Sequence, residues 1–242
     1  MKLLLTSGGI KNGSLESALV ELLGKPICES NALIVLTGIY PFLGGGGMAM
    51  QAINGRFASS LSGLGWKSLG LLELTALPSV NRDAWVPTVQ ETDAILVWGG
   101  DPLYLSHWMR QSGMADLLPS LNAVYVGVSA GSIATATTFG ETYLPAPTHS
   151  AVPITTEQVI FESSTGEMEM TFITAHGAGL VDFAVIPHFK NENHQEASLV
   201  NAEKWASMLP VPTYAIDDQT GIKVIDGVVE VVSEGEWKLF NL

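Results

Sequence analysis

The stretch "GVSAG" at 127–131 places Ser129 between two glycines, directly after a run of β-branched residues. A Gly-x-Ser-x-Gly pattern between a strand and a helix is typical of a nucleophile held at the tip of a strained turn. The glycines leave room for that turn, and the small residues that follow are compatible with a helix. The pattern therefore predicts Ser129 as a nucleophile, although a tight turn without catalytic function would use the same residues.

A serine nucleophile needs a general base, and the chain has five histidines. His188 ends the apolar stretch "FAVIPH" at 183–188. The ends of parallel strands are where open α/β folds gather their functional groups, so we expect His188 to be the base. The other four fit surface, packing or capping positions better: His107, His149, His176 and His194.

The base needs a carboxylate that orients its ring. Glu141 is the first choice, because it lies twelve positions after Ser129 and the chain can fold back there to the same edge of the sheet. Asp182 and Glu157 are the alternatives. Asp182 is expected at the far end of the strand that carries His188, about 20 Å away, and Glu157 falls in a segment without a clear anchor.

Gly99 and Gly100 follow the apolar stretch "AILVW" at 94–98. Glycines at the end of a strand allow the backbone to approach a ligand closely. We therefore expect the N–H groups of Gly100 and of Ala130, the residue after the serine, to form an oxyanion hole. Asp101 is explained completely as the cap of the helix that follows.

The net charge is −13 although only 14% of the 242 residues are charged. Without a basic cluster to neutralise phosphates, a nucleic-acid partner is not expected. No apolar stretch is long enough for a membrane span, and the short run in "MKLLLTSGG" predicts a first strand rather than a signal peptide. We therefore expect a cytoplasmic protein that does not bind membranes and acts on a small substrate.

Short apolar stretches alternate with longer amphipathic ones along most of the chain. This alternation predicts one α/β domain over 1–242, with a doubly wound, mostly parallel sheet and helices on both faces. The segment from about 141 to 181 interrupts the pattern and predicts an insertion, such as a hairpin. The ending "GIKVIDGVVEVVSEGEWKLF" predicts a small antiparallel meander. Strands are expected at 2–6, 32–36, 68–74, 94–98, 123–128, 183–188, 213–216, 222–225 and 228–232, and helices near 15–23, 47–62, 103–112, 114–121 and 192–207.

Taken in order, several stretches resemble the peptidase E (α-aspartyl dipeptidase) group of serine peptidases, which is related to cyanophycinase. They are "MKLLLTSGG", "AILVWGGDPLYL", "GVSAGS", "TTFGE", "VIPHF" and "PTYAIDDQTGIKV". The resemblance implies a fold similar to class I glutamine amidotransferases, with serine in place of their cysteine. It also implies Ser129 as nucleophile, His188 as base, Glu141 as the acidic member, and Gly100 with Ala130 as the oxyanion hole.

The chain departs from this family in ways that bear on specificity. It reads Asp-Pro-Leu after the two glycines, where the dipeptidases typically continue Gly-Asn-Thr, and it lacks an arginine that they carry before the "TT" stretch. A substrate aspartate therefore has no obvious partner, and Arg110 and Lys190 are the candidate substitutes. A longer segment between Ser129 and His188 would reshape the pocket further.

The sequence thus predicts a serine exopeptidase that hydrolyses dipeptides or short peptides, with N-terminal Asp as the specificity that the family implies. His188 would take the proton of Ser129, which would form an acyl-enzyme. This chemistry needs no metal or organic cofactor. Two alternatives stay open: an esterase of the α/β-hydrolase type, and a catalytically silent binding protein on the same scaffold. Apolar packing on an edge strand would support a homodimer.

Overall fold

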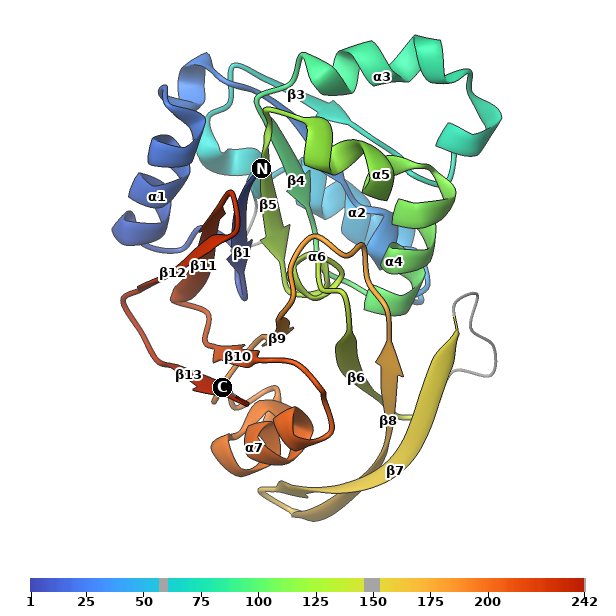
Figure 1. Cartoon of the computed structure of the whole chain (residues 1–242), viewed down its shortest axis with the longest axis vertical. Coiled ribbons are helices and arrows are strands. Elements are labelled where there is room, and N and C mark those ends of the chain that lie inside the picture. Colours follow the sequence, from blue (N-terminus) through green and yellow to red (C-terminus); the bar gives the residue numbers. More distant parts are fainter. Residues whose placement is uncertain (57–60, 146–152, 242) are drawn as a thin grey trace.

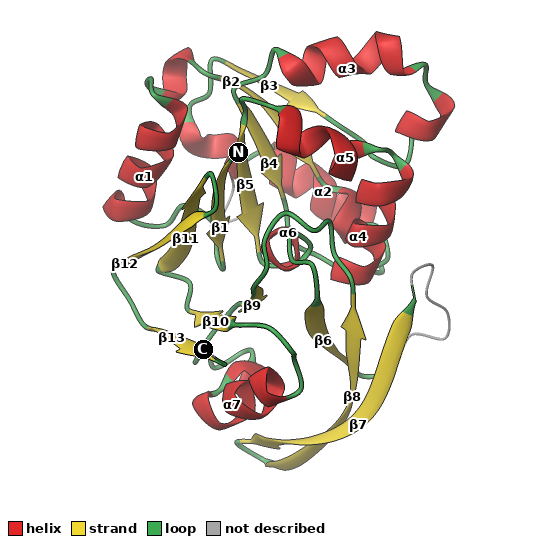
Figure 2. Cartoon of the chain, in the orientation of Figure 1, coloured by secondary structure: helices red, strands yellow, loops and turns green. Residues whose placement is uncertain are grey.

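The structure is a computed structural model and describes residues 1–56, 61–145 and 153–241. Figure 2 shows its helices and strands. The strands are β1 (Lys2–Thr6), β2 (Asn31–Val35), β3 (Ser68–Leu71), β4 (Ala94–Val97), β5 (Val124–Val128), β6 (Phe139–Tyr143), β7 (Ile154–Ser163), β8 (Gly166–Ala175), β9 (Ala184–Ile186), β10 (Thr213–Ile216), β11 (Thr220–Ile225), β12 (Val228–Ser233) and β13 (Trp237–Phe240). The α-helices are α1 (Gly13–Leu23), α2 (Gly45–Ile53), α3 (Arg82–Gln90), α4 (Pro102–Gln111), α5 (Met114–Leu117), α6 (Ala130–Ile133) and α7 (Leu199–Ser207).

The main sheet has seven strands in the order β12-β11-β1-β5-β4-β2-β3. Strands β1 to β5 of this sheet pair in parallel, whereas β11 and β12 are antiparallel to their neighbours. Helices α1 and α2 contribute to the core on one face, and α3, α4 and α5 to the core on the other. The α/β class with a mostly parallel sheet is therefore confirmed.

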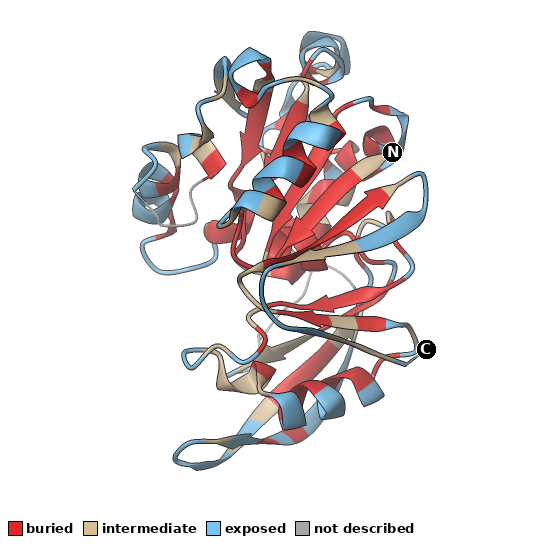
Figure 3. Cartoon of the chain, turned by 90° about the vertical axis from the view of Figure 1, so that its left-hand side faces the viewer, coloured by how far each residue is buried: buried red, intermediate tan, exposed pale blue. Residues whose placement is uncertain are grey.

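The central strands are apolar along their whole length because helices cover both of their faces. Every residue of β4 and β5 is buried, and Figure 3 shows the central strands of the main sheet as a buried layer, whereas the residues of the edge strand β12 are exposed or half-buried. Strand β5 thus holds its C-terminal end, where Ser129 follows, in the core of the molecule.

A smaller part of the molecule lies at the C-terminal edge of the main sheet, below it in Figure 1. It contains the three-stranded sheet β13-β10-β9, in which β10 is parallel to β9 and antiparallel to β13. Residues of this sheet, of α7 and of the hairpin β7–β8 form a hydrophobic cluster of their own. This part positions the residues that follow β9 and β10.

The C-terminal strands differ in detail from the predicted meander. The tight turn at Asp226 and Gly227, both with positive φ, joins β11 and β12 into a hairpin on the main sheet. Strand β13 instead pairs with β10. The reason lies in the connection before it, where the carboxylate of Asp217 accepts a hydrogen bond from the backbone N–H of Glu236 at 2.6 Å and draws the chain to the small sheet.

The segment 141–181 contains most of a third sheet, in the order β6-β8-β7, and β7 and β8 form a long antiparallel hairpin (Figure 1). Residues 146–152 lie outside the described ranges. That this segment is an insertion into a single domain stays a prediction.

Several helices depart from the predictions. Helix α3 was not predicted, because Pro87 interrupts the stretch "RDAWVPTVQ". The helix expected near 47–62 ends at Ile53, and the one expected near 114–121 is α-helical only to Leu117. The helix expected near 192–207 begins only at Leu199, because the residues before it form successive turns. Within the described ranges, none of the helices has the length and apolar character needed to cross a bilayer.

Candidate active site

Ser129 connects β5 to α6 in a strained backbone conformation, with φ 49° and ψ −114°. Residues other than glycine rarely adopt a positive φ, and such strain is concentrated at functional sites. The neighbouring chain enforces the conformation, because a Cβ atom on Gly131 would overlap the carbonyl oxygen of Val97. The geometry is that of a nucleophile turn, in which the serine side chain is lifted to the edge of the sheet.

The imidazole of His188 lies beside this serine, with 3.1 Å between its Nε2 and Ser129 Oγ. His188 follows β9 by two residues and also has a positive φ of 58°. Its backbone N–H donates to Ser7 Oγ at 2.7 Å, and Ser7 itself follows β1 of the main sheet. The structure therefore brings the predicted nucleophile and base to hydrogen-bonding distance.

The carboxylate on the other side of the ring belongs to Asp218, whose Oδ1 lies 2.9 Å from His188 Nδ1. The sequence analysis did not consider this residue. Asp218 follows β10, and β10 is the parallel neighbour of β9, so both strands deliver their side chains to the same edge. The signal was the pair of aspartates directly after the strand expected at 213–216.

Glu141, the predicted acidic member, is not the carboxylate hydrogen-bonded to His188. It lies on β6, and its Oε1 accepts a hydrogen bond from its neighbour's backbone N–H, that of Thr142, at 2.8 Å. Strand β6 pairs with β8 in the third sheet, which turns the chain away from β9 and β10. The two alternatives also lie elsewhere: Asp182 accepts from Thr137 Oγ1 at 3.0 Å, and Glu157 is exposed on β7.

Three further donors surround the carboxylate of Asp218. Ser7 Oγ donates to Oδ1 at 2.7 Å, and Lys11 Nζ and Asn191 Nδ2 donate to Oδ2 at 3.2 and 3.3 Å. The hydrogen bond from His188 lowers the pKa of Asp218 most, and with the contributions of Ser7 and Lys11 it outweighs the opposing effect of burial. Asp218 is therefore ionised at neutral pH, and its carboxylate accepts a hydrogen bond from the N–H at Nδ1 of the imidazole.

A pocket of about 400 Å³ opens beside Ser129 and His188. Among its described lining residues there is no lysine or arginine, whereas three carry carboxylates. The pocket is lined by Pro41, Phe42, Gly100, Asp101, Pro102, Ser129, Glu141, Thr142, Tyr143, Leu144, Pro187, His188, His194, Glu196, Ala197 and Trp205.

The carboxylates of this pocket differ in their affinity for protons. Burial, followed by the negative charges of Asp101 and Glu196, raises the pKa of Glu141 to about 8. Burial also raises the pKa of Asp101 above its ordinary value. For Glu196 burial acts in the same direction, but the hydrogen bond and the charge of His194, together with smaller contributions, outweigh it and lower the pKa. A cationic group of a ligand beside Asp101 and Glu141 would therefore be stabilised.

The predicted oxyanion-hole residues border the serine. Gly100 lines the pocket with a φ of 127°, and a Cβ atom there would overlap the carbonyl oxygen of Gly38. Only glycine therefore fits this close backbone approach. Ala130 is the first residue of α6. The predicted role of Asp101 as a helix cap is confirmed, since its Oδ1 accepts from the backbone N–H of Tyr104 at 2.7 Å.

The two basic residues considered for substrate binding are engaged elsewhere. Arg110 donates to the carbonyl oxygen of Gly177 through Nε and Nη2, and Lys190 forms an ion pair with Glu236. Neither residue is among those that line the pocket.

The remaining histidines have different surroundings. His107 packs edge-on against Trp108 and His176 is exposed, with Nδ1 3.0 Å from the carbonyl oxygen of Thr137. His149 lies outside the described residues. His194 was expected at a capping or solvated position, but it lines the pocket with its ring stacked on that of His188.

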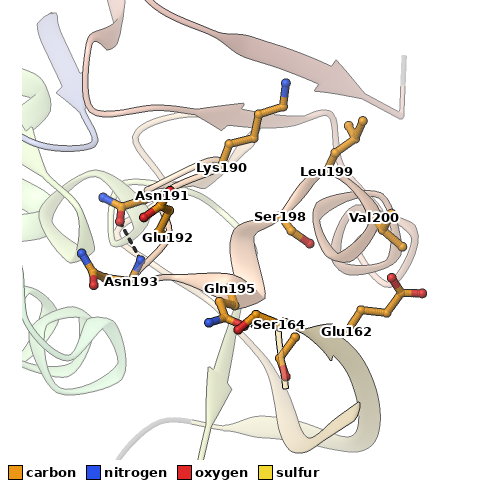
Figure 4. A pocket seen from close by; sticks show the side chains of 11 residues that line it. Glu162, Ser164, Lys190, Asn191, Glu192, Asn193, Gln195, Ser198, Leu199 and Val200 are labelled. Atoms are coloured by element: carbon orange, nitrogen blue, oxygen red, sulfur yellow. Dashed lines mark hydrogen bonds between the residues drawn. The ribbon is translucent and has the colours of Figure 1, made fainter. Parts of the chain in front are cut away.

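A larger groove of about 870 Å³ lies on the other side of the segment 190–198. Figure 4 shows its lining, which comes from this segment, from the end of the hairpin β7–β8 and from the start of α7. It is lined by polar side chains for the most part and contains neither Ser129 nor His188. Size alone therefore does not mark the site, and we place it at the smaller pocket.

Comparisons with known proteins bear on the fold and on the family. Two solved structures share the fold: a candidate peptidase E protein from Listeria monocytogenes EGD-e, with 17% identity, a TM-score of 0.61 and coverage of 97% of this chain and 98% of the other, and a peptidase from an acI-B1 Actinobacterium, with 18% identity, a TM-score of 0.59 and coverage of 98% and 88%. No curated protein sequence matches the chain. The model of peptidase family S51 matches residues 48–232, which is more than half of the sequence. The chain therefore belongs to peptidase family S51 and is a serine peptidase.

Proposed function

We propose that this peptidase is an exopeptidase that hydrolyses dipeptides or short peptides, with Ser129 as nucleophile, His188 as base and Asp218 as the acidic member. One observation carries the proposal: Ser129 Oγ, the two ring nitrogens of His188 and Asp218 Oδ1 form one hydrogen-bonded chain, with distances of 3.1 and 2.9 Å. The chain opens onto a pocket of about 400 Å³, a size that suits a short peptide.

The reaction follows from this arrangement. His188 Nε2 accepts the proton of Ser129 as Oγ attacks the carbonyl carbon of the scissile bond. The backbone N–H groups of Gly100 and Ala130 stabilise the negative oxygen of the tetrahedral intermediate. His188 then donates its proton to the leaving amine, and a water molecule, deprotonated by the same ring, hydrolyses the acyl-enzyme. Asp218 keeps the second proton of the imidazole on Nδ1 throughout.

The charges in the pocket favour a substrate with a free amino terminus. Asp101 and Glu196 present carboxylates, which attract an ammonium group, and a bound ammonium group would also favour the ionised form of Glu141. Arg110 and Lys190 are not available to bind an acidic side chain. We therefore expect peptides with neutral or basic N-terminal residues to be better substrates than Asp-x dipeptides. Membership of a peptidase family favours this function over an esterase and over a silent binding protein.

The test is release of free amino acids from a dipeptide panel that includes Asp-x, Ala-x and Lys-x members, each also with an acetylated amino terminus. We expect cleavage of the unblocked peptides only, and a loss of at least about 10³-fold in kcat for Ser129→Ala. The exposed Ser17→Ala on α1 is the matched control and should behave as the wild type. Absence of any Ser129-dependent cleavage would contradict the proposal, and preferred cleavage of Asp-x would contradict the expected charge preference.

A further inference from the structure

The ring of His194 lies almost parallel to that of His188, with 4.1 Å between ring centroids and 17° between planes. On its other side His194 Nδ1 is 2.9 Å from Glu196 Oε1. All three residues line the pocket beside Ser129. The proposed base is thus bonded at its two nitrogens and covered on one face by a second imidazole.

The backbone places His194 there through three successive turns. The N–H of Asn191 donates to the carbonyl oxygen of His188, that of His194 to Asn191, and that of Ala197 to His194, each at 2.9 Å. These turns fold the chain back after β9, so that residue 194 returns onto residue 188. The local chain path brings the ring into place, and hydrogen bonds from Ser164 N–H and Asn201 Nδ2 to Gln195, each at 2.7 Å, tie the segment to the β7–β8 turn and to α7.

We propose that His194, held by Glu196, is a positioning residue that keeps the ring of His188 in the plane joining Ser129 to Asp218. This inference rests on the proposed function, in which His188 is the base.

The physical reason is the freedom of the imidazole. Its terminal torsion has a broad, roughly two-fold potential, so hydrogen bonds alone leave room for tilting and flipping. The side chain of His188 is 20% exposed, which means that the pocket reaches part of it. A ring stacked on one face limits the tilt and excludes water from that face. A small tilt would lengthen the distance from Nε2 to Ser129 Oγ, on which proton transfer depends.

Charge supports the same role. The hydrogen bond to Glu196 raises the pKa of His194, and although burial opposes it, the hydrogen bond with His194 lowers the pKa of Glu196. The hydrogen bond between the two residues is thereby strengthened, and it holds His194 against the ring of His188.

Other charged groups also act on the two rings. Asp218 contacts His188 and carries Lys11 on its other oxygen, and Glu141 lies near enough to Glu196 for the two charges to interact. These groups remain in place in the variants below, so a change in titration is assigned to His194 and Glu196.

The segment 188–194 also holds the carboxylate of Asp218 in place. Figure 4 shows Asn191 on the side of the large groove, where its Oδ1 accepts a hydrogen bond from the backbone N–H of Asn193 at 2.9 Å. Its Nδ2 donates to Asp218 Oδ2 at 3.3 Å. The segment 188–194 thus orients the ring through His194 and the carboxylate through Asn191.

The experiment compares His194→Ala, which removes the ring, with His194→Phe, which keeps a flat ring without charge. The exposed His176→Phe is the matched control. For each protein, kcat and KM are measured against pH on the cleaved dipeptide, and the titration of His188 is followed by NMR with labelled histidine. Thermal unfolding checks that each variant is folded.

We expect His194→Ala to lower kcat about tenfold with KM nearly unchanged, because the base is misplaced by a fraction of an ångström. His194→Phe should recover most of the plateau kcat. Glu196→Gln weakens the hydrogen bond that holds His194, so we expect it to lower kcat by less than His194→Ala does. The control should leave kcat and KM unchanged.

Three outcomes would overturn the inference: an unchanged kcat and His188 titration in His194→Ala, a rise in KM alone, or an equal loss of kcat in His194→Ala and His194→Phe. A rise in KM alone would make His194 a group that binds the substrate, and an equal loss of kcat would show that the reaction needs its imidazole and not merely a stacked ring. The NMR titration needs no substrate. If the wild type shows no Ser129-dependent hydrolysis, the proposed function fails, while the His188 titration still decides whether His194 governs that ring.

Discussion

The main sheet and the small sheet β13-β10-β9 fix the positions of the site residues that follow their strands through different interactions. Ser129 follows β5, a strand buried along its whole length, and close backbone contacts around Gly131 fix its strained turn. His188 and Asp218 follow β9 and β10, which have only three and four residues, and side-chain hydrogen bonds hold them. The proposed nucleophile is thus placed by backbone packing, and the proposed base and acid are placed by a polar network.

Ser7 joins the two regions. It is fully buried after β1 of the main sheet, it accepts the backbone N–H of His188, and it donates to Asp218. The difference between the regions predicts that polar substitutions matter most in the small part, where no extended backbone packing replaces a lost hydrogen bond.

The largest effect is expected from Asp218→Asn, which should lower kcat/KM by about 10³-fold because the amide no longer favours the productive tautomer of His188. Glu141→Gln is the matched control, a carboxylate of the same pocket, and should lower it by no more than about threefold. Steady-state kinetics on the cleaved dipeptide measure both. The reverse order of effects would return the acidic role to Glu141, as the sequence suggested.

Trp205→Ala tests the core of the small part. Trp205 is 2% exposed and packs against Phe161 and Phe172, with ring centroids 6.3 and 5.7 Å away. We expect a loss of about 3–5 kcal/mol in the free energy of unfolding, measured with denaturant. Leu19→Ala, in the core of the main sheet, is the comparison. A loss below about 1 kcal/mol for Trp205→Ala would mean that this cluster does not hold the small sheet in place.

Ser7→Ala tests the hydrogen bonds that connect the main sheet to His188 and Asp218. The change leaves the backbone N–H of His188 without its acceptor and removes one donor from Asp218, so we expect kcat to fall about tenfold. The expected loss is smaller than for Asp218→Asn, because Lys11 and Asn191 still bind the carboxylate. Equal activity of variant and wild type would show that the two regions are aligned without this serine.

The smallest expected effect is the pH dependence that Glu141 gives to the free energy of unfolding. Its pKa is raised to about 8, so the folded protein favours the protonated acid. The stability that the raised pKa of Glu141 contributes is fully present below the ordinary carboxyl pKa. It is lost as the pH rises through about 8, because the buried acid must then ionise. Glu141→Gln should therefore be more stable than the wild type by about 1 kcal/mol at pH 9, after allowance for exposure to the pocket. Thermal unfolding at pH 5 and 9 measures the difference, and identical pH dependence would contradict it.

The sequence was most informative where function depends on neighbouring residues. The Gly-x-Ser-x-Gly turn needs only a strand, two glycines and a serine, and His188 could be chosen because it ends an apolar strand. Asp218 follows a predicted strand as well, but its contact with His188 depends on the parallel pairing of β10 with β9, which the sequence does not show and which brings together residues thirty positions apart.

The other differences have the same origin. Glu141 lies close to Ser129 in the sequence and lines the same pocket, but its strand β6 pairs with β8 and not with β9 or β10. His194 was expected at a capping or solvated position because nothing in its own sequence neighbourhood indicates three consecutive turns. Periodicity predicts elements well, and it does not predict which elements pair.

The location of Ser129 and His188 on separate sheets has a consequence for how the enzyme loses activity. The 3.1 Å between Oγ and Nε2 depends on how two sheets pack against each other, through a cluster that contains Val185 and Ile216 as well as residues of the main sheet. A relative slip of about 1 Å breaks that hydrogen bond while every strand and helix stays intact. On gentle warming, catalysis should therefore stop before circular dichroism records any melting, and it should return at once on cooling.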